Sequence, residues 1–213
     1  MNAPESAAAL APASQHLFDA PPPTGPLRID WAPPTADPRW HYARIDGPLG
    51  RVLLLADGDA LAGLHFEGSR HVPAVRAAWT ESPRHPMLVA AAAQLAQWCA
   101  GTRSAFDLPL RLHGTPFQHA VWKAIAGIPP GATTSYAALA AASGRPRAVR
   151  AAGAATGRNP VSIMVPCHRV MGAGGAITGY AGGLERKRAL LAFEAHARAG
   201  RQAVLSALEE GVG

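Results

Sequence analysis

The sequence has few cysteines, few aromatic residues and little charge for its length of 213 residues. Its two cysteines, Cys99 and Cys167, are too few for a disulfide framework or a four-cysteine zinc site, and they suit a reducing compartment. No apolar run approaches the roughly 20 residues that a transmembrane helix needs. The first ten residues lack a basic segment followed by an apolar stretch, so they do not predict a secretory signal. We therefore expect a cytoplasmic protein that does not act at a membrane.

The charge that is present lies unevenly along the chain. The net charge is +6, and residues 114–194 alone carry +7, from nine Lys and Arg against two Glu. Residues 1–113 hold nine basic and ten acidic side chains, and residues 195–213 hold two of each. A basic segment of this kind is expected where a protein faces a phosphate backbone. A solvated arginine-rich surface would explain the same charge, so both interpretations stay open on charge alone.

Composition divides the chain into four parts. Residues 1–38 contain nine of the twenty prolines, cannot bury enough apolar surface to offset their ordering entropy, and are expected to form a flexible tail. We expect a small α/β domain over residues 40–110 and a helical domain over residues 114–196. Residues 197–213 are expected to extend the last helix and then fray. The predicted fold class is α+β.

The expected α/β domain carries signals of a hairpin followed by a helix. Two apolar runs, Arg51–Ala56 and Ala60–Phe66, flank Asp57-Gly58-Asp59, and Asp-Gly between such runs is a strong hairpin signal. These runs predict a short antiparallel sheet. Residues 86–100 predict a helix that has proline in its first turn. Cys99 falls on the apolar face of this helix, so we expect a buried, unreactive thiol.

The second domain is predicted to contain two short helices around a glycine-containing turn. Ser135 is a good N-cap for a helix over residues 136–143, Gly144 ends it, and residues 146–157 predict another helix. This is the layout of a helix-turn-helix. The second helix is rich in alanine and glycine, with basic side chains at intervals: Arg147, Arg150 and Arg158. Such a helix can lie deep in a nucleic-acid groove, although a tightly packed helical hairpin would also use small residues.

The most specific feature is Pro166-Cys167-His168-Arg169-Val170, which follows an apolar run over residues 161–165. A cysteine beside arginine and histidine can have a lowered thiol pKa and act as a nucleophile. Adjacent side chains of an extended segment point in opposite directions, so this motif does not simply repeat the Cys/His dyad of a thiol protease.

Glu194 is a second candidate for chemistry. It lies three and four positions after Leu191 and Leu190, on the buried face of a helix expected from about residue 184. A carboxylate on a core face needs a partner. His168 would complete a Glu–His–Cys relay, whereas an Arg or Lys at a helix end would satisfy the carboxylate equally well.

Over residues 114–194 the sequence closely resembles the O6-alkylguanine-DNA alkyltransferase family. The motifs that carry the resemblance occur in the family's order: Gly114-Thr115-Pro116-Phe117-Gln118, Val121-Trp122-Lys123, Ser135-Tyr136, Asn159-Pro160, Pro166–Val170 and Gly179-Tyr180-Ala181-Gly182-Gly183. Residues 42–101 resemble the family's N-terminal α/β domain more loosely. Several independent stretches match in order, so chance does not explain the similarity.

The resemblance implies DNA repair by direct reversal, in which each molecule reacts once. Cys167 would accept the alkyl group from O6 of guanine, while the choice between guanine and O4-alkylthymine depends on pocket volume. His168 would take the thiol proton through a bound water, and Glu194 would orient and charge that histidine. Tyr136 would donate a hydrogen bond to the departing guanine. Asn159 would brace the turn before the reactive loop.

The implied partner is double-stranded DNA that carries an alkylated guanine, approached from the minor groove with the damaged base flipped out. Arg150 would fill the gap left in the duplex. Tyr180 and Ala181 would belong to a loop that closes over the base; many members have serine in place of Ala181, so only its backbone N–H can bond O6. Further contacts to DNA or substrate are expected from Arg147, Thr134 and Ser135. The resemblance implies a monomer with no cofactor and no metal.

Three other functions compete with this interpretation. A helix-turn-helix regulator would explain the basic segment but has no need of a nucleophilic cysteine between proline and histidine. A cysteine-dependent hydrolase would explain Cys167 but not the paired helices. A non-catalytic alkyl-lesion-binding protein would lack the reactive cysteine, which this chain has.

Overall fold

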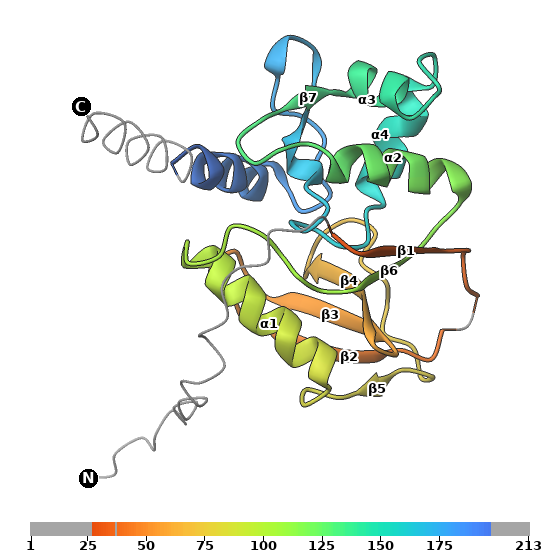
Figure 1. The fold of residues 1–213 in the computed structure, drawn as a ribbon, viewed down its shortest axis with the longest axis vertical. Helices are drawn as coiled ribbons and strands as arrows, with labels where there is room; N and C mark the ends of the chain where they lie inside the picture. The colour runs from red at the N-terminus through yellow and green to blue at the C-terminus, as the bar shows by residue number, and fades with distance from the viewer. Residues whose placement is uncertain (1–26, 37, 197–213) are drawn as a thin grey trace, which may run out of the picture.

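The computed structural model describes residues 27–36 and 38–196, which fold into a sheet domain and a helical domain that lie against each other (Figure 1). The strands of the sheet are β1 (Ile29–Ala32), β2 (His41–Ile45), β3 (Val52–Asp57), β4 (Ala60–Phe66), β5 (Thr80–Glu81) and β6 (Leu110–His113). In the described chain they form one sheet in the order β1-β6-β4-β3-β2-β5, and α1 (Pro86–Cys99) packs against its central strands. The predicted α+β fold is confirmed.

The predicted hairpin is present as β3 and β4. Val52 pairs with Phe66 and Asp57 pairs with Ala60, and the turn contains Gly58 at φ +59°, a conformation that glycine adopts without strain. Strands β2, β3 and β4 form the expected antiparallel sheet. Strands β1, β5 and β6 join it through parallel pairs, so the complete sheet is mixed. The parallel pair of β4 and β6 follows from α1, because a helical crossover returns the chain in the same direction.

The expectation of a flexible tail over residues 1–38 is wrong for its last part. Ile29 pairs with Leu110 in the parallel β1–β6 ladder. The side chains of Ile29 and Trp31 pack against the main core, so this short stretch buries enough apolar surface to join the sheet. Composition averaged over the whole proline-rich stretch hid its alternating pattern. The rest of that expectation, over residues 1–26, lies outside the described residues.

The helical domain contains the predicted helices. They are α2 (Pro116–Ala126), α3 (Tyr136–Ala142), α4 (Val149–Gly157) and a last helix over residues 184–196. The predicted extension over residues 197–213 lies outside the described part of the chain. No helix within the described residues is both long and apolar enough to cross a bilayer.

The helix-turn-helix differs from the prediction at one point. α4 begins at Val149 rather than at Pro146, because residues 145–148 form a turn closed by the Ala148 N–H, which donates to the Arg145 carbonyl at 2.9 Å. Arg147 therefore lies in the turn before the second helix and not on the helix itself. Arg150 lies on α4, in its first turn.

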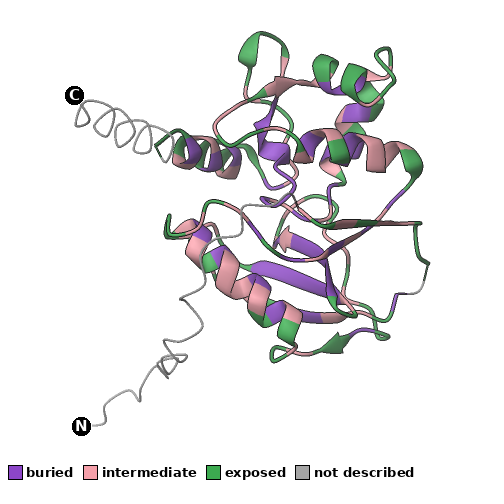
Figure 2. Cartoon of the chain, in the orientation of Figure 1, coloured by how far each residue is buried: buried purple, intermediate pink, exposed green. Residues whose placement is uncertain are grey.

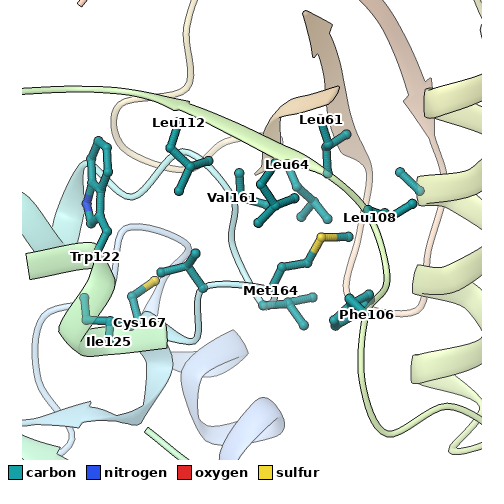
Figure 3. Close-up of a cluster of buried hydrophobic side chains, with 14 of the residues drawn as sticks. Leu61, Leu64, Phe106, Leu108, Leu112, Trp122, Ile125, Val161, Met164 and Cys167 are labelled. Atoms are coloured by element: carbon teal, nitrogen blue, oxygen red, sulfur yellow. The ribbon is translucent and has the colours of Figure 1, made fainter. Parts of the chain in front are cut away.

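One apolar core runs through both domains, and Figure 2 shows buried residues along the inner side of each. Figure 3 shows Leu61 and Leu64 of β4 in the same cluster as Trp122 of α2 and Cys167. Backbone bonds also join the domains, because the N–H of Leu64 donates to the Pro160 carbonyl at 2.9 Å and its carbonyl accepts from Ser162 at 3.0 Å. The segment before Cys167 is therefore attached to the central sheet.

Candidate active site

Cys167 begins the 3₁₀ turn η2 (Cys167–Arg169), at the end of the mostly buried segment 161–166. Its side chain is 4% exposed and lies in the same apolar cluster as Ile125 (Figure 3). The Sγ atom accepts a hydrogen bond from Asn159 Nδ2 at 3.1 Å. Burial raises the pKa of the thiol, and the hydrogen bond from Asn159 offsets only part of that effect. The resting residue is therefore a neutral thiol.

The lowered thiol pKa that the neighbouring arginine and histidine suggested is not found in the resting protein: burial has the larger effect, and the His168 backbone lowers the pKa only slightly. The Arg169 guanidinium turns to Glu194, with Nε donating to Oε2 at 2.9 Å and Nη2 donating to Oε1 at 2.5 Å. Its charge is paired with a carboxylate and is not directed at the sulfur. Activation of Cys167 must then come from a group that removes the thiol proton.

His168 and Glu194 are brought together as the sequence suggested, and Arg169 shares the same carboxylate. His168 is fully buried, and its Nε2 lies 3.1 Å from Glu194 Oε1. Burial alone would raise the pKa of the Glu194 carboxyl, but hydrogen bonds from His168 and Arg169 lower it to about 2. Burial lowers the pKa of His168, and the carboxylate opposes this only in part. At neutral pH the pair is thus a carboxylate beside a neutral imidazole.

These charges determine which nitrogen of His168 carries the proton. An ionised carboxylate only accepts hydrogen bonds, so Nε2 must be the N–H that donates to Glu194. Nδ1 then has a lone pair, and it makes no hydrogen bond to any described residue. A buried imidazole held in this form can accept a proton at Nδ1. Glu194 is therefore placed to orient His168, whose imidazole is neutral at rest.

Asn159 braces the reactive segment through both ends of its amide. Its Oδ1 accepts from the Val161 N–H at 3.1 Å, and its Nδ2 donates to the Val165 carbonyl at 2.7 Å as well as to Cys167. Between these anchors Ile163 has φ +72°, which is strained for a β-branched residue and costs on the order of 1–3 kcal/mol. Strain of this kind is typical of a functional segment that the surrounding fold holds in place.

Tyr136 holds the loop expected to close over a base. Its hydroxyl donates to the Gly179 carbonyl at 2.7 Å. Gly179 has φ +53°, and a Cβ at this position would lie 2.8 Å from the Tyr136 hydroxyl, so only glycine fits. The hydroxyl predicted to bond guanine is therefore already engaged and would have to exchange its partner.

A cavity of about 220 Å³ opens between α4, this loop and the sheet domain. Its walls include Tyr136, Tyr180 and Ala181. The volume is below the roughly 300–1,000 Å³ of sites for drug-sized ligands and suits a smaller group. Burial raises the pKa of both tyrosines, and negative charge on Cys167 would raise it further, so the sulfur lies near both rings.

The remaining predicted contacts fall into two groups. Arg147 and Arg150 are exposed, in the turn before α4 and on α4 respectively. Thr134 and Ser135 instead form β7, which pairs with β8 (Val170–Met171), the strand that begins at the last residue of the Pro166–Val170 motif. The Ser135 hydroxyl also accepts from the Ala138 N–H at 3.1 Å as the N-cap of α3. Thr134 and Ser135 therefore tie the helix-turn-helix to the reactive segment.

The sequence analysis missed Lys187. This side chain is fully buried, and its Nζ donates to the carbonyls of Val170 at 2.5 Å and Thr178 at 2.6 Å. Burial lowers the pKa of Lys187, whereas negative charge on Cys167 raises it, so the ammonium would stabilise a thiolate. A signal was available, because Lys187 precedes Glu194 by seven residues, which places both on one face of the last helix.

Comparison with known proteins agrees with this geometry over most of the chain. Residues 116–196 match a family model described as the 6-O-methylguanine DNA methyltransferase DNA binding domain, and residues 40–112 match the ribonuclease-like domain of the same methyltransferase. The methylated-DNA–protein-cysteine methyltransferase of Mycobacterium bovis is 46% identical over 154 residues, covering 72% of this chain and 92% of that protein. The protein of the same name from Methanosarcina barkeri is 42% identical, covering 72% and 96%.

Solved structures agree as well. The structure of Mycobacterium tuberculosis OGT in complex with DNA matches with a TM-score of 0.68 and 44% identity, covering 74% of this chain and 94% of that chain. The Mycobacterium tuberculosis O6-methylguanine methyltransferase matches with a TM-score of 0.67 and 44% identity, over the same shares. Together with the two family models, these matches show that the chain belongs to the O6-methylguanine-DNA methyltransferase family.

Proposed function

We propose that this chain repairs alkylated DNA by moving the alkyl group from O6 of guanine, or from O4 of thymine, onto its own Cys167. The observation that carries the proposal is the neutral His168, held by Glu194 so that Nδ1 can accept a proton beside a buried thiol. The proton of the Cys167 thiol would pass from sulfur to His168 Nδ1 through a water molecule. By accepting this proton, His168 offsets the free-energy cost that burial adds to forming the thiolate.

The transfer itself is an in-line displacement at carbon. The sulfur forms a bond to the alkyl carbon while the bond from that carbon to oxygen breaks, and the electron pair stays with the departing base. The departing guanine or thymine gains one proton and the thiol loses one, so the overall reaction needs no cofactor. Tyr136 would release the Gly179 carbonyl and donate to the base, which stabilises its developing negative charge.

The product is a thioether on Cys167, which explains why each molecule would act once. A carbon–sulfur bond of this kind has no good leaving group, and the site offers no nucleophile positioned to displace it. The sulfur also loses the ability to form a thiolate. The reaction is therefore stoichiometric and irreversible.

The damaged base would reach the thiol by leaving the duplex. Extrusion costs roughly a few kcal/mol, and insertion of the exposed Arg150 side chain into the vacated stack would offset part of that cost. Apart from Arg150, α4 carries mostly alanine and glycine, so its backbone can approach the floor of the minor groove. Arg147 would contact the flanking backbone. A monomer suffices, because all these groups come from one chain.

A mass measurement tests this proposal. The protein is incubated with a duplex that contains one O6-methylguanine, and the intact protein and the DNA are then weighed. We expect one methyl group on each protein molecule, unmodified guanine in the DNA, and no further reaction when fresh duplex is added to the spent protein. A duplex with O4-methylthymine tests the second substrate, and an unmodified duplex is the control. Protein that keeps its mass while it binds the lesion would contradict the proposal.

A further inference from the structure

The sheet domain supplies one wall of the cavity that lies between α4 and the loop at Gly179. After β4 the chain turns toward the helical domain, and Arg70 and His71 line the same cavity as Tyr136 and Tyr180. The Arg70 N–H donates to the Ala181 carbonyl at 3.0 Å, so the two loops are joined by a backbone bond. The cavity is thus an interdomain site, although the chemistry lies in the helical domain alone.

Arg70 differs from several other arginines of the sheet domain because its side chain has no partner among the described residues, a feature that it shares with Arg39 and Arg84. Arg44, Arg51 and Arg111 each form an ion pair, with Glu67, Asp46 and Asp30 respectively, at 2.8–3.0 Å. The exposed Arg70 side chain makes no hydrogen bond or ion pair with any described residue, although its backbone is held in place. An arginine that is positioned but unpaired is available to bind an anion.

A second unpaired arginine lines the same cavity from the opposite side. Arg158 follows the last turn of α4, is exposed, and makes no side-chain bond to a described residue. No Asp or Glu lines this cavity. Glu185 borders a neighbouring hollow that also includes Arg70, and it lies 3.7 Å from Arg188. Two like charges at one cavity repel each other, and an anion between them would remove that repulsion.

The backbone geometry agrees with a binding role. His71 has φ +64°, a left-handed conformation that costs a residue with a side chain about 1–3 kcal/mol and that concentrates at ligand-binding loops. On the facing helix, a Cβ at Gly157 would meet no other atom within 4 Å, so this side of the cavity is open space. A large group can therefore approach between the two arginines.

We propose that Arg70 and Arg158 bind the backbone phosphate of the extruded nucleotide, so that the sheet domain takes part in DNA binding. The inference rests on the proposed function, because it takes the cavity to be the place where the damaged base enters. A base in DNA carries its phosphate a fixed distance away, and the guanidinium groups at the rim match the charge and geometry of that group. Arg70 is then a substrate-positioning residue outside the helix-turn-helix.

Arg70→Ala and Arg84→Ala form a matched pair for the test. Each removes one exposed positive charge from the sheet domain, but Arg84 belongs to the segment between β5 and α1, which Figure 1 shows on the side of that domain away from the helical domain. The alanine keeps the backbone bond to Ala181, and thermal melts of both variants check the fold. Arg70→Lys keeps the charge and serves as a conservative variant.

Two measurements are made on each variant: binding to a lesion-containing duplex across a salt titration, and reaction with free O6-benzylguanine, which has no phosphate. For Arg70→Ala we expect duplex affinity to fall roughly tenfold. The slope of log affinity against log salt should become shallower by about 1. We expect an unchanged rate with the free base, and partial recovery of affinity in Arg70→Lys. Arg84→Ala should match the unmodified protein.

Two results would overturn the inference. Equal duplex affinity and salt slope in Arg70→Ala and Arg84→Ala would show that no phosphate is bound there. An equal fold-loss in duplex affinity and in the rate with free O6-benzylguanine would show that Arg70 only supports the loop. Failure of the unmodified protein to react with either substrate would instead contradict the proposed function, while the binding comparison would still decide the role of Arg70.

Discussion

The two cysteines lie in different domains, and burial raises the pKa of both thiols. Cys99 ends α1, is half-buried rather than buried as expected, and its thiol has no hydrogen-bond partner among the described residues. Cys167 is more deeply buried, yet Asn159 donates to its sulfur and the charge of Lys187 favours the thiolate. Under the proposed function, the reactivity of Cys167 would follow from neighbours that can receive a proton and stabilise sulfur, and not from a low resting pKa.

The largest expected effect comes from removing one thiol at a time. Cys167→Ala should abolish alkyl transfer because it removes the proposed acceptor sulfur, and Cys99 lies in the other domain. The variant should still bind modified duplex, since the exposed Arg147 and Arg150 are unchanged. Cys99→Ala should transfer at the rate of the unmodified protein. Both variants are examined by intact mass after incubation with O6-methylguanine duplex. A methyl group gained by Cys167→Ala would show that Cys167 is not the acceptor.

A second large effect is expected at Glu194, which distinguishes the environment of Cys167 from that of Cys99. Glu194→Gln should slow transfer by roughly 10²–10⁴-fold, because the amide can donate to Nε2 and release the tautomer of His168. It should also cost about 3 kcal/mol of unfolding free energy, since it leaves Arg169 buried without a counter-charge. Single-turnover kinetics and denaturant unfolding measure the two losses. Glu185→Gln, on an exposed carboxylate, should change neither.

The stability difference at Glu194 should depend on pH. The carboxyl pKa is about 2 in the folded protein, below its ordinary value of 4.5, so its contribution is complete above pH 4.5 and is lost as pH falls toward 2. The free energies of unfolding of the unmodified protein and of Glu194→Gln should therefore converge over this range. A difference in unfolding free energy that stays constant from pH 7 to pH 3 would show that His168 and Arg169 do not lower the pKa of the Glu194 carboxyl.

A smaller effect is expected at Arg150, on the DNA-binding face. Arg150→Ala should slow repair in duplex DNA by roughly tenfold or more, because the vacated stack loses the side chain that fills it. It should leave the rate with free O6-benzylguanine unchanged, since that substrate needs no flipping. Arg84→Ala is the control for loss of charge. Equal losses on both substrates would show that Arg150 does not enter the stack.

The pH dependence of transfer tests the neutral base directly. Burial lowers the pKa of His168 below 6.5, so Nδ1 should keep its lone pair in mildly acidic solution and lose it only at lower pH. The rate with free O6-benzylguanine should therefore stay high at pH 6.5 and decline below it. The same profile on Cys99→Ala excludes a contribution from the other thiol. An acidic midpoint at or above 6.5 would mean that burial does not keep His168 neutral.

The smallest effect is the change in stability after reaction. An alkyl group on Cys167 enters close-packed space, where overpacking typically costs about 1–3 kcal/mol. The melting temperature should fall by several degrees after complete reaction with a free alkylated guanine. Cys99→Ala should show the same fall. An unchanged or higher midpoint would show that the pocket accepts the group without strain.

Local patterns predicted a large part of this molecule. The Asp57–Asp59 turn, Pro116 and Ser135 mark element ends through chemistry that acts within a few residues, so the hairpin and helices were predictable. Cys167, His168 and Glu194 were predictable as candidates because motif and helical periodicity place them on buried positions. The resemblance added roles that spacing could not supply.

The remainder depends on contacts between distant segments. β1 forms only because β6 offers an edge, and Arg169 turns from the sulfur only because the last helix presents Glu194. The position of Arg70 depends on the loop at Ala181, more than one hundred residues away in sequence. Such effects arise from tertiary packing, so single-sequence patterns do not contain them.

The location of the transferred group tests the central claim most directly. The unmodified protein is reacted to completion with O6-methylguanine duplex, digested under denaturing conditions, and its peptides are analysed by mass spectrometry. We predict that the peptide containing Cys167 carries the methyl group and that the peptide containing Cys99 is unmodified. A methyl group on Cys99, or one divided between the two thiols, would contradict the proposal that the surroundings of Cys167 make it the acceptor.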